Sequence, residues 1–158
     1  MVMTEPISAP RPPQSQILDR AKAMVPALRD KALQVEKDRV ISYETHRAFQ
    51  EAGFYKLFQP ARFGGYEFPI RMLVEVAGEL GRGCGSSAWI FTNLATQNWI
   101  IGMHRPEAQD EMWGNDPSAL AASSFPTQGG TGRYVDGGIV LNGIWSFASG
   151  IDFVDWEN

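Results

Sequence analysis

The 158-residue chain is short of several residue types, and each shortage excludes something. A single cysteine, Cys84, leaves no disulfide to form within the chain, so a reducing, cytoplasmic setting is our default expectation. Lysine and arginine total 14 against 18 acidic residues, and this net charge of −4 argues against a nucleic-acid-binding protein. The first residues lack the apolar stretch of a secretory leader.

Glycine does not occur before Gly53, and all 16 glycines lie between there and Gly150. Basic residues thin out in the other direction, since Arg133 is the only one after Trp113. Helix interiors avoid glycine, whereas tight turns between strands use it. The chain therefore changes from helix to strand along its length, and we predict an α+β fold.

No charged residue occurs over positions 84–103. The length suits a membrane span, but the many amides and hydroxyls in this stretch are costly in lipid, so we expect no membrane partner. A buried central helix capped by Ser86 fits better. On it Trp89, Asn93 and Gln97 lie four apart and share one face. This polar line either bonds neighbouring helices or faces a cavity, and the pattern leaves both readings open.

Apolar residues at three-to-four spacing predict the other helices. The proline-rich residues 1–14 are expected to form a disordered lead-in. A first helix begins at Ser15 and is kinked or broken at Pro26, and a second begins at Ser42. Together with the central helix these make a helical domain over residues 15–116.

Residues 117–158 are predicted to contain strands. The small residues over 119–124 suit a strand, Asp136-Gly137-Gly138 predicts a hairpin, and Asn142-Gly143 is a second turn signal. The strand pattern stops without a closing signal, so we expect these residues to be the first strands of a longer β domain. Unpaired edges would then make the isolated chain poorly soluble or partly unfolded.

Three features that resemble reactive sites have simpler readings. The glycines over 81–85 follow a helix rather than a strand, so they mark a tight turn and not a dinucleotide site. Cys84 has no base beside it and is read as a small packed residue. His46 has no partner in the pattern and is expected to be structural or exposed. We expect no metal site.

Four segments, in order, resemble the acyl-CoA dehydrogenase superfamily and, within it, the oxygenase components of two-component flavin-dependent monooxygenases that hydroxylate 4-hydroxyphenylacetate or the phenolic secosteroid of steroid breakdown. Each motif alone is weak, but their order and spacing are fairly specific. The four segments are Leu57–Glu67, Gly83–Trp89, Ala121–Pro126 and Leu141–Gly150.

The resemblance implies a fold with an N-terminal helical domain, a middle β domain and a C-terminal four-helix bundle, of which the bundle would be absent here. It implies an enzyme that takes reduced FMN or FAD from a separate flavin reductase. The resemblance further implies that molecular oxygen adds at flavin C4a and that the hydroperoxide hydroxylates a small aromatic substrate, with a phenol as the expected case. It also implies a homotetramer for the full-length protein, while the chain alone would be inactive.

The same resemblance assigns site residues. Ser123 matches a serine beside the flavin, and Trp145 matches a tryptophan that packs near the isoalloxazine. Ser149 matches a hydroxyl near flavin N5, with Ser146 as its rival because the register there is uncertain. Trp89 and Asn93 would contact the substrate, on the face of the central helix that carries Gln97.

Position 97 departs from the family, because phenol-hydroxylating members carry a histidine eight residues after the matching tryptophan. Glutamine can orient a hydroxyl but cannot take its proton. Either Gln97 orients a phenol that is deprotonated otherwise, or the substrate is not a phenol. His104 follows Gly102, so we expect it at the surface or at a helix end and not in the place of the missing base.

Two other functions stay open. An acyl-CoA dehydrogenase-type FAD oxidoreductase shares the fold, but its usual acidic motifs are missing from Ser124 to Gly130. A non-catalytic helical interaction domain, or an inactive truncated fragment, would not explain why the four motifs occur in order.

Overall fold

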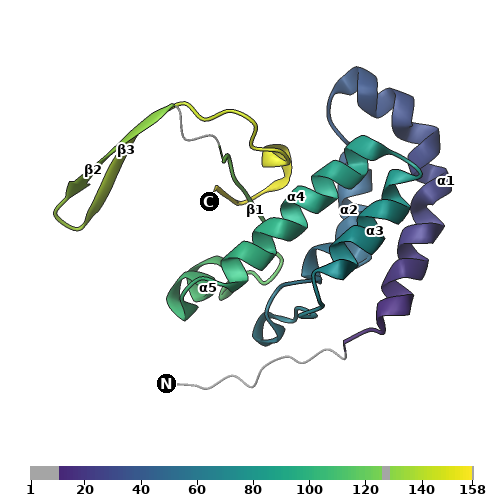
Figure 1. Ribbon diagram of the computed structural model, residues 1–158, viewed down its shortest axis with the longest axis horizontal. Helices are drawn as coiled ribbons and strands as arrows, with labels where there is room; N and C mark the ends of the chain where they lie inside the picture. Colours follow the sequence, from purple (N-terminus) through teal and green to yellow (C-terminus); the bar gives the residue numbers. More distant parts are fainter. Residues whose placement is uncertain (1–10, 126–128, 158) are drawn as a thin grey trace.

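The computed structural model describes residues 11–125 and 129–157. In that part of the chain four helices pack side by side, and a fifth, short helix lies at the C-terminal end of the fourth (Figure 1). The helices are α1 (Gln14–Asp38), α2 (Tyr43–Glu51), α3 (Arg71–Gly81), α4 (Gly85–Gly102) and α5 (Pro106–Trp113). Most of the expected lead-in, residues 1–10, lies outside the described residues.

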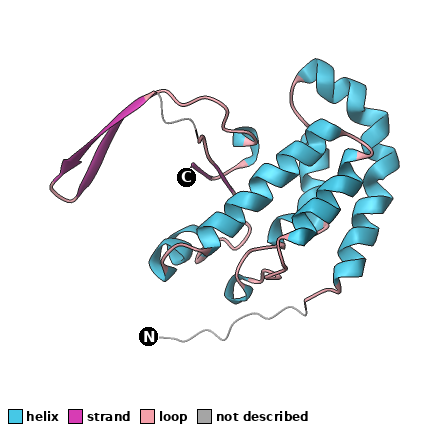
Figure 2. Ribbon diagram, viewed as in Figure 1, coloured by secondary structure: helices cyan, strands magenta, loops and turns pink. Residues whose placement is uncertain are grey.

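The strands are few and short. They are β1 (Ala121–Ala122), β2 (Gly130–Val135), β3 (Gly138–Gly143) and β4 (Trp156–Glu157). Three single-turn 3₁₀ helices complete the described elements, at Phe54–Lys56, Ala61–Phe63 and Ile151–Phe153. Helices come first and strands second, so the α+β prediction is confirmed (Figure 2).

The core of the helical part is centred on α4. Phe91 of α4 meets Phe49 and Phe54 at centroid distances of 6.3 and 5.8 Å, with the rings close to edge-on. All three side chains are fully buried, and each contributes about 2–3 kcal/mol of apolar burial. The helix is buried along most of its length, as its lack of charge predicts.

Helix boundaries follow the sequence signals in part. Ser42 caps α2, because its Oγ accepts a hydrogen bond from the Thr45 amide at 3.2 Å. The caps predicted at Ser15 and Ser86 are wrong, since α1 begins at Gln14 and α4 at Gly85. In both cases the serine lies inside the first helical turn, where its hydroxyl cannot cap.

Pro26 does not break α1, which continues to Asp38. Proline removes one backbone hydrogen bond, but Val25 and Leu28 beside it are both buried. Burial of the apolar face on both sides of the proline outweighs the lost bond.

The predicted hairpin is confirmed at its turn, but a second turn predicted at the base of the hairpin is absent. Val135 pairs with Gly138, so Asp136 and Gly137 form the two-residue turn, with Gly137 at φ +81°. The second turn predicted at Asn142-Gly143 is wrong: Asn142 pairs with Thr131, and β3 continues through both residues. Every residue of β2 and β3 is exposed, and the hairpin projects away from the helices (Figure 2).

The end of the described chain returns to the helical part. Strand β4 pairs in parallel with β1, joining Ala121 to Trp156. Of the small-residue run 119–124 only β1 is strand, because its pairing partner is itself two residues long. Among the described residues, no helix combines the length and apolar character needed to cross a bilayer.

Candidate functional site

Gln97 reaches from α4 to the end of β1. Its Nε2 donates to the hydroxyl of Ser123 at 2.7 Å, and the side chain is only 2% exposed. Its Oε1 is also buried and has no donor among the described residues. An amide with one end bonded and the other end free is a hydrogen-bond acceptor held in a fixed direction.

Trp89 reaches from the same helix face to the segment before Gly150. Its indole Nε1–H donates to Ser149 Oγ at 3.1 Å, while its ring is 60% exposed. Eight helical residues separate Trp89 from Gln97, which is about 12 Å along the axis. The two contacts therefore tie α4 to two separate segments of the β part.

The rest of the polar line on α4 is satisfied within the helix. Asn93 donates to the carbonyl of Trp89, while Thr92 and Thr96 each donate to the carbonyl one turn earlier. The sequence left open whether this polar line bonds neighbouring helices or faces a cavity. Its side chains do not bond neighbouring helices. Trp89 and Gln97 are the side chains that extend beyond the helix, and they extend to the β segments.

Segments 121–125 and 146–150 are also bonded to each other. The hydroxyl of Ser124 donates to the carbonyl oxygen of Ser146. Ser146 itself has an exposed side chain, whereas Ser149 is half-buried. The sequence did not single out Ser124, although it follows Ser123 directly. Pro126, the last residue of that motif, lies outside the described residues.

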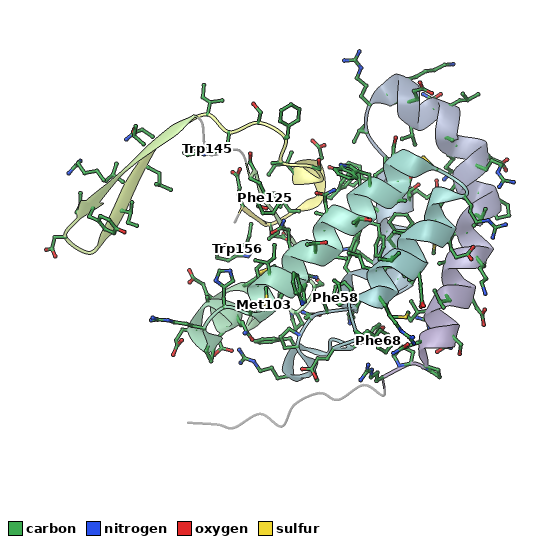
Figure 3. The ribbon with its side chains drawn as sticks, in the orientation of Figure 1. Phe58, Phe68, Met103, Phe125, Trp145 and Trp156 are labelled. Atoms are coloured by element: carbon green, nitrogen blue, oxygen red, sulfur yellow. The ribbon has the colours of Figure 1, made fainter. Side chains whose placement is uncertain are left out.

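Two exposed aromatic rings lie at the ends of these segments, Phe125 within the first and Trp145 directly before the second. Trp145 lies over the base of the hairpin, where a Cβ on Gly130 would come within 2.2 Å of its ring. Trp145 is 39% exposed and Phe125 69% exposed, and both lie between the hairpin and α4 (Figure 3). The missing side chain of Gly130 leaves the room that the indole occupies beside β2.

The 150–155 segment is fixed to α2 by an aromatic contact that the sequence did not predict. Phe153 stacks on His46 with ring centroids 4.7 Å apart. His46 Nδ1 also forms a hydrogen bond of 3.2 Å with the Tyr55 hydroxyl. Burial lowers the pKa of His46, and the charge of Asp155 raises it by a smaller effect. His46 is thus structural and buried, one of the two readings the pattern left open.

Neither histidine lies at Gln97. His46 is taken up by Tyr55 and Phe153, and His104 follows the end of α4, where it lines a separate hollow of about 170 Å³. Cys84 is buried, as its reading as a packed residue predicts.

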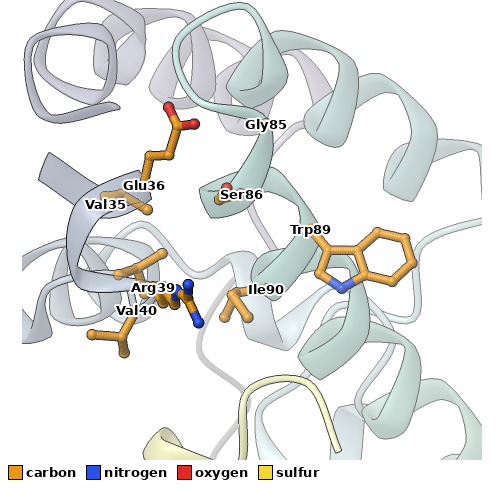
Figure 4. A pocket seen from close by; sticks show the side chains of 9 residues that line it. Val35, Glu36, Arg39, Val40, Gly85, Ser86, Trp89 and Ile90 are labelled. Carbon is orange, nitrogen blue, oxygen red and sulfur yellow. The ribbon is translucent and has the colours of Figure 1, made fainter. Parts of the chain in front are cut away.

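A larger pocket, of about 520 Å³, lies beyond Trp89 between the end of α1 and the start of α4 (Figure 4). Trp89 and Ile90 form one side, and Val35, Glu36 and Arg39 form the other. The exposed indole thus has the pocket beside it while its N–H is bonded to Ser149.

The described residues form a helical N-terminal domain followed by short strands. Residues 12–116 match the family model described as "Acyl-CoA dehydrogenase, N-terminal domain". The chain belongs to the acyl-CoA dehydrogenase family, and the resemblance seen in the four motifs is confirmed.

Its relatives include oxygenase components. The chain is 34% identical over 139 residues to the flavin-dependent monooxygenase oxygenase subunit HsaA of Rhodococcus jostii RHA1, covering 88% of this chain and 36% of that protein. It is 30% identical over 160 residues to the FADH2-dependent resorcinol hydroxylase oxygenase component of a Rhizobium strain, covering 98% and 39%.

A crystal structure of the HsaA monooxygenase from M. tuberculosis superposes with a TM-score of 0.88 at 33% identity. It covers 92% of this chain, and this chain covers 40% of that one. The chain thus spans well under half of the length of the proteins it matches.

Proposed function

We propose that this chain supplies the α4 side of the active site of the oxygenase component of a two-component flavin-dependent monooxygenase. The observation that carries the proposal is the pairing of Gln97 with Ser123 and of Trp89 with Ser149. Candidate site residues that lie 26 and 60 positions apart in the sequence are joined in pairs by the fold. The matched relatives are themselves oxygenase components.

The residues at this site suit a flavin. Hydroxyls of Ser123, Ser124 and Ser149 can bond the polar edge of an isoalloxazine, and the exposed ring of Trp145 offers an apolar surface for its flat face. Reduced FMN or FAD, when bound, supplies the activation of molecular oxygen. A flavin reductase would deliver it.

Gln97 would hold the substrate. Its free Oε1 accepts a hydrogen bond from a hydroxyl, and a neutral amide cannot remove the proton. The arrangement suits a small aromatic substrate that carries a hydroxyl group, with Asn93 one turn earlier on the same helix face. The orientation of the ring would then be set by Gln97 and the proton would leave by another route.

Ser149, rather than Ser146, is our choice for the hydroxyl beside the reactive part of the flavin. Ser149 is half-buried and bonded to Trp89, whereas Ser146 contributes its carbonyl to the contact with Ser124. A hydroxyl held by a second side chain is better oriented than one that turns freely in water.

The test is a single-turnover mixing experiment. Photoreduced FMN or FAD is mixed with the full-length form that the resemblance implies, and then with oxygen and either resorcinol or p-hydroxyphenylacetate. Hydroxylated product, with little hydrogen peroxide and no need of a CoA ester, supports the proposal. If acyl-CoA instead bleaches bound FAD, the protein is a dehydrogenase. Peroxide alone, at the rate of free flavin, contradicts both activities.

We also propose an oligomeric state and a location for the full-length protein. A homotetramer and a cytoplasmic location both follow from the resemblance and from the single cysteine. Size-exclusion chromatography with light scattering tests the first, and fractionation of the source cells tests the second.

A further inference from the structure

The loop 146–150 is held in a costly shape. Phe147 has φ +68°, which a residue with a side chain adopts at a cost, and its ring is 86% exposed. Burial of the ring therefore cannot offset that cost. The Ser149 amide donates to the Phe147 carbonyl at 3.0 Å, which keeps the loop tight.

Both ends of this loop are anchored. The carbonyl of Ser146 accepts from Ser124, and Gly150 lies so close to α4 that a Cβ there would approach Leu94 to 2.7 Å. Gly150 also has φ +93°. A strained segment fixed at both ends holds its residues in one direction, and Ser149, next to the anchored Gly150, is the residue of the segment whose hydroxyl is bonded to α4.

Trp89 adds direction to the hydroxyl of Ser149. An indole N–H can only donate, so Ser149 Oγ accepts and its own proton points away from Trp89. A tryptophan that served packing alone would be buried, yet this ring is 60% exposed. The hydrogen bond from its N–H to Ser149 therefore explains the position of Trp89 better than packing of its ring does.

We infer that Trp89 is a positioning residue that acts through Ser149, so that the Ser149 hydroxyl donates to an acceptor atom of the bound flavin. The inference rests on the proposed function, because the flavin is the ligand. It differs from the direct substrate contact expected for Trp89 from the sequence. In this role the Trp89 indole sets the direction of the hydrogen bond that Ser149 donates to the flavin.

The first test observes the indole–serine bond without any ligand. The five tryptophans give five indole signals in a ¹H–¹⁵N NMR spectrum, and Trp89→Phe identifies one of them by its loss. Ser149→Ala should move that signal upfield, and the matched control Ser146→Ala should leave it in place. An unmoved signal in Ser149→Ala would overturn the inference while leaving the proposed function untouched.

The second test measures the dissociation constants of photoreduced FMN and FAD for the full-length form under anaerobic conditions. Trp89→Phe and Ser149→Ala should each weaken the tighter-binding flavin by about fivefold, the worth of one hydrogen bond. The double variant should bind as Ser149→Ala does, because Trp89 then has nothing to position. The control Trp99→Phe changes another exposed tryptophan of α4 and should have no effect.

The outcomes are distinguishable. If the two effects multiply in the double variant, or if Trp89→Phe binds normally, Trp89 does not act through Ser149. Binding that is absent already in the unsubstituted full-length form contradicts the proposed function and the inference with it. Circular dichroism of each variant separates lost binding from lost folding, and Ser149→Ala tests the same bond with Trp89 in place.

Discussion

Gln97 donates to Ser123 at 2.7 Å and leaves its own Oε1 buried without a donor among the described residues. An unpaired buried acceptor costs about 1–3 kcal/mol. Ser87 Oγ and Asn98 Oδ1 of the same helix are also buried without a partner among the described residues, and only Gln97 is bonded to Ser123 as well, so its Oε1 is the one that we propose as an acceptor for a ligand. This relationship leads to a test that does not depend on turnover.

Gln97→Leu is expected to leave the free energy of unfolding unchanged or to raise it by up to about 1 kcal/mol. Leucine removes the unpaired oxygen and retains most of the volume, while Ser123 is half-buried and can bond water instead. Chemical denaturation followed by tryptophan fluorescence measures the change.

Gln59→Leu is the matched control. Gln59 is 1% exposed and donates to the Pro117 carbonyl at 2.7 Å. Its loss should cost about 1 kcal/mol. If Gln97→Leu were as damaging as Gln59→Leu, Gln97 would be an ordinary structural residue.

Acid should weaken the fold through His46. Burial lowers the pKa of His46 below its ordinary value of 6.5, so the unfolded chain takes up the proton first. Stability is therefore complete above pH 6.5 and falls as the pH drops through 6.5 towards the lowered value, by at most about 1.4 kcal/mol per pH unit. Urea denaturation at a series of pH values gives the slope.

His46→Phe keeps a ring on Phe153 and should flatten this dependence between pH 7 and 5. His104→Gln, which changes the other histidine, should leave it in place. Acid sensitivity that persists in His46→Phe would assign the effect to carboxylates instead.

Gly150→Ala should destabilise the protein and displace the 146–150 loop. Alanine at φ +93° costs about 1 kcal/mol, and the approach of its Cβ to Leu94 adds about 1–3 kcal/mol. Gly137→Ala has the same kind of backbone strain at φ +81° with open space around it, so it should cost no more than about 1 kcal/mol.

The NMR signal of the Trp89 indole gives the local readout. It should move in Gly150→Ala, because Ser149 is displaced, and stay in place in Gly137→Ala. Equal thermal melts for the two variants would mean that Leu94 yields to the new methyl group.

Much of the helical part was predictable because its signals are local. The absence of charge over 84–103 predicts a buried helix, and Ser42 predicts a cap, without reference to any distant residue. The cap predicted at Ser86 failed for a physical reason: a serine serves equally well inside a first turn, and the sequence does not show where the turn begins.

The site was predictable only as a set of residues, not as a set of contacts. Asn142-Gly143 has the composition of a turn, but its pairing with β2 keeps it extended. Which serine meets Trp89, and that Phe147 lies at positive φ, depend on how the loop docks on Leu94. Contacts between residues 26 or 60 positions apart leave no local pattern.

Gln97→His should raise turnover on simple phenols at neutral pH, in the single-turnover system described above. A neutral imidazole at this position can take the proton that the amide cannot, and general-base catalysis typically contributes about 10²–10⁴-fold. The gain should disappear below the pKa of the new histidine, so a pH–rate profile with an acid limb is the measurement. Gln97→Met, which has similar volume and no base, should not show the gain. An unchanged rate and product in Gln97→His would place Gln97 outside the site, whereas a new acid limb would place its side chain at the substrate hydroxyl.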